Sequence, residues 1–122
     1  MANIQDSLRE ILKELKNTGD IEASVISSNQ GLVMVSDVPE NIPEALLGAY
    51  TATIIGSAKT VMEEIQKNPP NMLIIRSPDA ITIIMEAGKL AILSSLFRDG
   101  MNIGLVIVEM EKACRKISKI LE

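Results

Sequence analysis

One long uncharged stretch constrains the fold of this chain more than any other feature. Residues 45–58 carry no charged side chain, and they lie in a segment, residues 43–67, that has Pro43 as its first predicted helical residue and is ended by Asn-Pro-Pro-Asn. A membrane-spanning helix needs about 20 apolar residues, so this shorter run is not expected to cross a bilayer. The segment therefore predicts a long helix of a soluble protein.

This predicted helix has two unlike faces. At about 100° per residue, the large apolar side chains share one face that we expect to cover a sheet: Leu46, Leu47, Tyr50, Ile54, Ala58, Val61 and Ile65. The opposite face, which is normally charged in a monomer, carries only small residues: Ala45, Gly48, Ala49, Ala52 and Gly56. Each glycine inside a helix costs about 1 kcal/mol relative to alanine, whereas small residues at this spacing let two helices approach closely.

The small-residue face therefore predicts a dimer interface. Two alternatives stay open at this point. The first or last helix of the same chain could cover the small residues, or they could form a plain exposed alanine face.

Hydrophobic periodicity and turn residues predict the other elements. Turns at Asn29-Gln30-Gly31, Ser77-Pro78-Asp79 and Ala87-Gly88 separate short apolar runs. The result is helices at 4–17, 43–67 and 102–121, and strands at 21–28, 32–36, 72–76, 80–86 and 89–97. The order α-β-β-α-β-β-β-α predicts one α+β domain over residues 1–122, with helices on the faces of a five-stranded antiparallel sheet.

The strand at 72–76 is predicted to lie at a sheet edge, because it follows two prolines and opens the second group of strands. An apolar edge strand is usually shielded or paired, and pairing with its own copy across a two-fold axis would achieve this. The alternative is a central strand with neighbours on both sides. With the small residues of the long helix, the predicted dimer interface consists of Ala45, Gly48, Ala49, Ala52, Gly56, Met72, Ile74 and Arg76.

The composition excludes several kinds of chemistry. The chain has no histidine and one cysteine, so it cannot form a Ser-His triad, a histidine-ligated metal site, a zinc thiolate cluster or an internal disulfide. Only 2% of residues are aromatic and the net charge is −4, which disfavours base stacking and binding to phosphate backbones. We therefore expect no catalytic residue, no cofactor, no metal and no nucleic-acid partner.

The remaining polar residues have ordinary interpretations. The carboxylates near Asp37 and the pair Glu63-Glu64 are expected to be solvated, and residues 100–104 to form a turn and helix cap. Cys114 is expected to be a buried small apolar residue, because no histidine could activate it. Charged residues interrupt the first turns, which does not fit an export signal, and a lone cysteine fits a reducing cytosol. A cytoplasmic location is therefore expected.

Three stretches carry a resemblance to a known family: Asn29 to Asp37, Ala45 to Ile65, and Gly100 to Val106. Their order and spacing resemble the roadblock family, also called the dynein light chain roadblock type. The resemblance implies a profilin-like α/β/α sandwich with strand order 2-1-5-4-3. It also implies a homodimer in which the strands at 72–76 pair into one continuous sheet and the middle helices pack side by side.

The resemblance also implies a function without catalysis. Members of this family regulate Ras-like GTPases, act as scaffolds for small GTPases, or link cargo to motors as light chains. The main hypothesis is a homodimeric module that binds and regulates a Ras-like GTPase through the helices at 43–67. The alternatives are a motor- or complex-associated adaptor of the same fold, a small-ligand sensor, which would need a cavity with convergent polar groups, and, least supported, a small enzyme.

Overall fold

The computed structural model describes residues 3–19, 21–98, 100 and 102–122. Met101, which belongs to the third stretch of family resemblance, therefore lies outside the described residues. The elements follow one another in the predicted order: α1 (Ile4–Lys16), β1 (Ile21–Ser28), β2 (Val33–Asp37), α2 (Glu44–Glu64), β3 (Met72–Arg76), β4 (Ile81–Ala87), β5 (Ala91–Phe97) and α3 (Ile103–Leu121).

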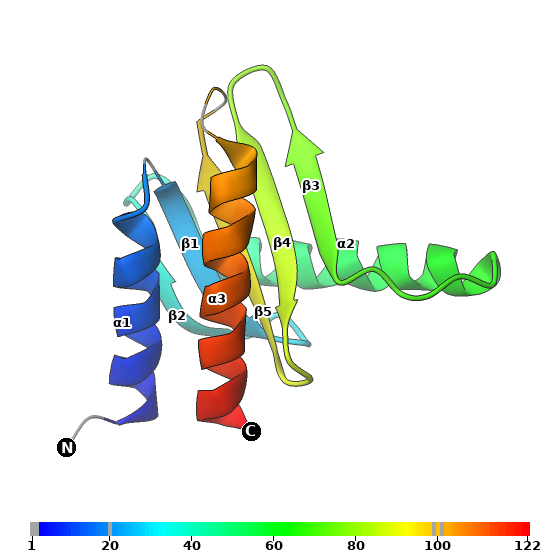
Figure 1. Cartoon of the computed structure of the whole chain (residues 1–122), viewed down its shortest axis with the longest axis horizontal. Coiled ribbons are helices and arrows are strands. Elements are labelled where there is room, and N and C mark those ends of the chain that lie inside the picture. The colour runs from blue at the N-terminus through cyan, green and yellow to red at the C-terminus, as the bar shows by residue number, and fades with distance from the viewer. Residues whose placement is uncertain (1–2, 20, 99, 101) are drawn as a thin grey trace.

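The five strands form one antiparallel sheet in the order β2-β1-β5-β4-β3. Helices α1 and α3 lie side by side on one face, and α2 crosses the other face (Figure 1). This arrangement is the profilin-like α/β/α sandwich with strand order 2-1-5-4-3, so the predicted fold is confirmed. No helix among the described residues is both long enough and apolar enough to span a membrane.

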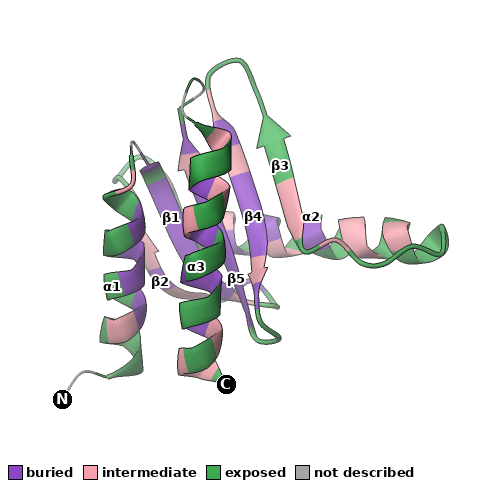
Figure 2. Ribbon diagram, in the orientation of Figure 1, coloured by how far each residue is buried: buried purple, intermediate pink, exposed green. Residues whose placement is uncertain are grey.

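The larger hydrophobic core lies between the sheet and the helices α1 and α3. Leu8 and Leu12 of α1, Met110 and Ile117 of α3, and Phe97 of β5 are all almost fully buried in it. Figure 2 shows the buried residues of both helices on the side that faces the strands. Burial of each such side chain contributes about 1.5–3 kcal/mol, and this core is much larger than the one on the other face, so this side of the sheet supplies most of the apolar burial of the fold.

Both of these helices begin at an asparagine cap. The side chain of Asn3 accepts a hydrogen bond from the N–H of Asp6 at 2.8 Å, and that of Asn102 accepts one from Leu105 at 3.1 Å. Each bond satisfies an amide that the first turn of a helix leaves without a partner. The helix cap predicted within residues 100–104 is therefore confirmed at Asn102.

Helix α2 is shorter than predicted. Pro43 is its N-cap rather than its first residue, and the helix ends at Glu64. Gln66 has a φ of 60° and donates to Glu63, while Lys67 donates to Met62. These two bonds form a Schellman motif, so the helix ends through its own backbone geometry before the prolines are reached.

Candidate interaction surface

The large apolar side chains of α2 and its C-cap point away from the sheet. Leu46, Tyr50, Ile54, Val61 and Ile65 are between 39% and 62% exposed. Figure 2 shows the far half of α2 as mostly exposed or half-buried. The prediction that this face covers the sheet is therefore wrong. Only the two remaining residues of the predicted face, Leu47 and Ala58, are half-buried. We call the five exposed residues the outer row.

The side of α2 that contacts the protein's own sheet layer includes only part of the small-residue face, Gly48 and Ala52. The buried residues of the helix are Gly48, Thr51 and Ile55. A Cβ atom on Gly48 would lie 2.7 Å from the carbonyl oxygen of Gly31 and 2.8 Å from Cγ2 of Val33. The turn between β1 and β2 therefore approaches the helix so closely that a side chain at position 48 has no room.

Gly31 meets this contact from the other side. Its φ is +91°, which favours glycine, and a Cβ there would lie 2.9 Å from Cα of Ala49. Gly48 and Gly31 thus serve a close backbone contact inside the chain. The alternative that the first or last helix covers the small residues is wrong, because the β1–β2 hairpin and not α1 or α3 encloses Gly48.

Beyond this contact, α2 is held by a small second core. Ile55 packs with Ile84 of β4 and Ile92 of β5, and Ala52 and Leu73 lie against them. On the same face, Lys59 Nζ lies 2.5 Å from the Glu86 carboxylate. The second core is much smaller than the first, so α2 buries little of its own apolar surface.

Strand β3 is an edge strand. It pairs with β4, and no other strand of the described residues lies beside it. Ile74 and Ile75 are 45% and 43% exposed, on opposite faces of the strand. The prediction of an edge position is confirmed, and the alternative of a central strand is excluded.

The predicted interface residues have different environments. Gly48 is enclosed by its own chain and Ala52 is half-buried against the second core, so we exclude Gly48 from the interface proposed below. The others are exposed or half-buried on two elements: Ala45, Ala49 and Gly56 of α2, and Met72, Ile74 and Arg76 of β3.

The two elements meet at one edge of the molecule. Leu73 of β3 packs against the core that contains Ile55 of α2, and Figure 1 shows α2 continuing well past β3 beyond the sheet. The open strand edge and the projecting half of the helix therefore form one surface, which includes Val61 and Ile65 of the outer row. Sequence reasoning missed the outer row because it ranked the faces of α2 by hydrophobicity.

The residues considered for chemistry have ordinary surroundings. Lys16 lies 3.7 Å from Asp37, and Ser36 donates a hydrogen bond to the carboxylate of Glu44. Across the described ranges, no three histidine, cysteine or acidic side chains are grouped as a metal site would require. Cys114 is buried as predicted. Burial, with the nearby Glu111 charge adding to it and Arg115 opposing it, raises the pKa of its thiol to about 12, so it is not a reactive thiolate at neutral pH.

The fold and this surface define a class: an α/β/α domain that presents an apolar helix face beside an open sheet edge, as protein-interaction modules do. The sequence model of the Roadblock/LC7 domain matches residues 8–97. The chain belongs to the Roadblock/LC7 family.

Relatives and solved structures agree with this assignment. Two uncharacterized proteins of Methanocaldococcus jannaschii are similar in sequence. MJ0714 is 28% identical over 93% of this chain and 96% of its own length, and MJ1340 is 30% identical over 88% and 93%. Myxococcus xanthus MglB has the same fold, with a TM-score of 0.91 at 16% identity over 99% of this chain and 92% of its own. Acanthamoeba castellanii profilin II is more distant, with a TM-score of 0.61 at 18% identity over 89% and 94%.

Proposed function

We propose that this protein is a homodimeric, non-catalytic module that binds and regulates a Ras-like small GTPase. One observation carries the proposal: the large apolar side chains of α2 are exposed next to an open strand edge. A monomer gains nothing from keeping Tyr50 or Val61 in water, whereas a contiguous apolar surface of this kind is typical of protein interfaces.

The dimer would form around the β3 edge. Two copies of β3, related by a two-fold axis, would pair antiparallel and join both sheets into one, which satisfies the unpaired backbone groups of both edges. The projecting half of α2 would then lie under the partner's sheet. The small exposed residues Ala49 and Gly56 would let the two helices pass closely. Self-association of this architecture is supported by a structure of MglB with a tetrameric arrangement. That structure has the same fold, with a TM-score of 0.87 at 14% identity over 98% of this chain and 91% of its own.

The GTPase would dock on the outer row. Two helices packed flank to flank still leave side chains such as Tyr50 and Leu46 facing solvent, and the pair would present them twice. Aromatic residues that are exposed in the free protein frequently dominate binding energy in interfaces. The family resemblance supplies the Ras-like GTPase as the partner, and the chain itself would contribute no cofactor, no metal and no reacting group.

The dimer is tested by sedimentation velocity on the whole chain. We expect the wild type to be a dimer at micromolar concentration, and Ile74→Lys and Gly56→Leu to be shifted toward the monomer. Gly56 is a suitable position because it is exposed and a Cβ there meets nothing within 4 Å. Leu90→Lys is the matched control, since Leu90 is 49% exposed in the β4–β5 turn. If the wild type is a monomer, or if Ile74→Lys and Gly56→Leu both remain dimers, the proposed dimer interface is contradicted.

The partner is tested by titrating a Ras-like GTPase of the same organism, loaded with GDP or with a non-hydrolysable GTP analogue. We expect one nucleotide state to bind more tightly, and Tyr50→Ala to weaken that binding by at least about tenfold. Leu90→Ala serves as the control, and sedimentation shows whether each variant is still a dimer. If the wild type binds neither state while remaining a dimer, the adaptor function becomes the better explanation.

A further inference from the structure

The open edge of β3 presents a defined set of backbone groups. At one end of the β3–β4 pair, the N–H of Glu86 donates to the carbonyl of Asn71 at 3.1 Å. At the other end, the N–H of Ser77 donates to the carbonyl of Ala80 at 2.9 Å. Hydrogen-bonded pairs alternate along an antiparallel ladder, so in the register of this pair the odd-numbered residues of β3 bond to β4. The backbone groups that face the open edge belong to Met72, Ile74 and Arg76.

Prolines lie at both ends of this series. The next positions in it are Pro70 and Pro78, and a proline has no N–H to donate. Both are equally far from Ile74, so a two-fold axis through Ile74 sets the prolines opposite each other and lets every residue between them bond. Any other two-fold register sets one of the edge-facing residues opposite a proline, opposite a residue that bonds to β4, or beyond the end of the strand.

We propose that β3 pairs with its own copy in the register centred on Ile74, and that the partner's Arg76 then forms an ion pair with Glu111 of this chain. The inference rests on the two-fold pairing of β3 in the proposed function. It adds the register of that pairing and a charged contact between the chains that depends on the register.

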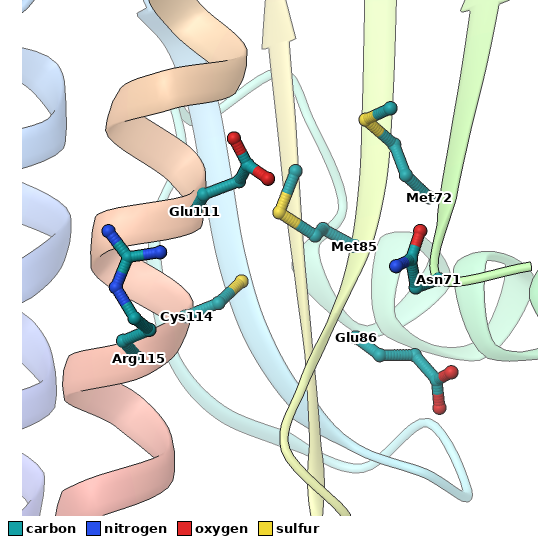
Figure 3. A pocket seen from close by; sticks show the side chains of 7 residues that line it. All are labelled: Asn71, Met72, Met85, Glu86, Glu111, Cys114 and Arg115. Atoms are coloured by element: carbon teal, nitrogen blue, oxygen red, sulfur yellow. The ribbon is translucent and has the colours of Figure 1, made fainter.

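The contact would form at a hollow on the α3 side of the sheet. This hollow has a volume of about 190 Å³ and lies between α3 and the strands β3 and β4 (Figure 3). Met72 and Met85, which are paired across the two strands, line it from below, and Glu111 lines it from α3. Met72 also contributes to the core on this side, so the edge-facing residues have their side chains on the α3 face.

The register brings the partner's Arg76 to this hollow. It lies directly opposite Met72, on the same face of the joined sheet, with the two Cβ atoms about 4.5–5.5 Å apart. Met85, Met72 and the partner's Arg76 then form one row across neighbouring strands. The apolar stem of an arginine can lie along such a surface while the guanidinium extends further, here over Met72 toward α3.

Glu111 is the acceptor that the hollow offers. In Figure 3 its carboxylate points from α3 toward the strands, whereas the side chain of Arg115 runs along the helix. Among the residues that the structure describes, no ion pair or side-chain hydrogen bond involves the Glu111 carboxylate. The other carboxylate that lines the hollow, Glu86, is paired with Lys59.

Arg76 is exposed, and it already has an interaction within its own chain. The ion pair with Glu111 does not require that interaction to break, because a guanidinium has several N–H donors in one plane. The two-fold axis makes the contact twice in each dimer. Charge pairs at an interface contribute more to register and partner choice than to affinity, so this contact favours the Ile74-centred register over its neighbours.

Cysteine cross-linking of the whole chain tests the register. Ile74→Cys should form a disulfide between two copies, because opposite residues of a hydrogen-bonded pair have Cα atoms about 5.5 Å apart, which a disulfide can span. Ile75→Cys is the matched control: it faces the partner's Leu73, so it should link at least about tenfold more slowly. The wild type, whose Cys114 is buried, gives the background. A faster link at position 75 than at position 74 would overturn the register.

Charge reversal, followed by sedimentation velocity, tests the ion pair. Arg76→Glu and Glu111→Arg each set like charges against each other at both contacts, and each should weaken the dimer by about tenfold or more. A one-to-one mixture of the two variants should form a heterodimer about as tight as the wild type, because opposite charges then meet at both contacts. Lys119→Glu and Glu10→Arg are the matched controls, since both residues are exposed and neither lines the hollow.

The outcomes separate this inference from the proposed dimer. A monomeric wild type contradicts the dimer itself. If the wild type is a dimer but both reversals leave it unchanged, or mixing restores nothing, the ion pair is overturned and the dimer stands. Rescue in the double variant Arg76→Glu/Glu111→Arg without rescue by mixing would place the contact inside one chain, which also overturns the proposal.

Discussion

The contact between α2 and the β1–β2 hairpin gives a sharp prediction, because the same substitution has opposite effects at two glycines of one helix. In a helix interior, glycine to alanine contributes about 1 kcal/mol to stability. A Cβ at Gly56 meets nothing within 4 Å, so Gly56→Ala should show this gain in full. A Cβ at Gly48 would lie 2.7 Å from the carbonyl oxygen of Gly31, and that backbone atom cannot move without shifting the hairpin.

The magnitude follows from these distances. Overpacking a closely packed site costs about 1–3 kcal/mol, and the second contact, 2.8 Å from Val33, places Gly48→Ala in the upper part of that range. After the helix-propensity gain is subtracted, Gly48→Ala should lower the free energy of unfolding by about 1–2 kcal/mol. The two variants should therefore differ by about 2–3 kcal/mol.

Urea unfolding followed by far-ultraviolet circular dichroism measures this difference. Every variant is compared at the same protomer concentration, and at a second one, because dimerisation makes apparent stability concentration-dependent. If Gly48→Ala is as stable as Gly56→Ala, the glycine contact is not part of the fold in solution. If Gly48→Ala instead keeps its stability but loses the dimer, Gly48 belongs to the interface between chains after all.

Two further predictions concern the ends of helices. Gln66→Gly should raise the free energy of unfolding by about 1 kcal/mol, because Gln66 has a φ of 60° at the C′ position of α2; no gain in urea unfolding would contradict that conformation. At the end of α3, hydrogen bonds from Ser118 and from the N–H of Lys89 lower the pKa of Glu122 below 4.5. The stabilisation by the ionised Glu122 side chain is present at neutral pH and is lost as the pH falls through the folded-state pKa. Glu122→Gln should therefore flatten the pH dependence of thermal unfolding below about pH 5. An unchanged pH profile would exclude a stabilising role for the Glu122 carboxylate.

The sequence predicts the fold where pattern and packing agree. Helices α1 and α3 each have one apolar face and one charged face, and each begins at an asparagine that caps it. The strands lie between turn residues whose geometry is local, such as Gly31 and Gly88, both with positive φ. In these elements the face that is more apolar is also the face that is buried, so periodicity alone identifies it.

The faces of α2 could not be assigned in the same way. Apolar residues lie on all sides of α2, so the hydrophobic periodicity of the helix is weak. Size alone then predicts that the larger apolar side chains are the buried ones. The decisive factor is distance rather than hydrophobicity: the hairpin approaches the helix closely enough that only Gly48 and the small residues near it fit. That approach depends on contacts between residues far apart in the sequence, such as Gly31 with Ala49, which a pattern along one helix does not contain.

The two hydrophobic cores show how little the outward-facing large side chains of α2 contribute to folding. Between the sheet and helices α1 and α3, apolar burial is extensive, whereas α2 contributes Ile55 and little else to the smaller core. Polar residues on the inner side of α2, such as Thr51, are satisfied within the helix by Leu47 and Gly48 carbonyls. The fold therefore obtains most of its stability from one face of the sheet, and the large side chains of α2 contribute little to it. Because exposed side chains such as Tyr50 gain stability only when another molecule covers them, the outer row is better explained by binding than by folding.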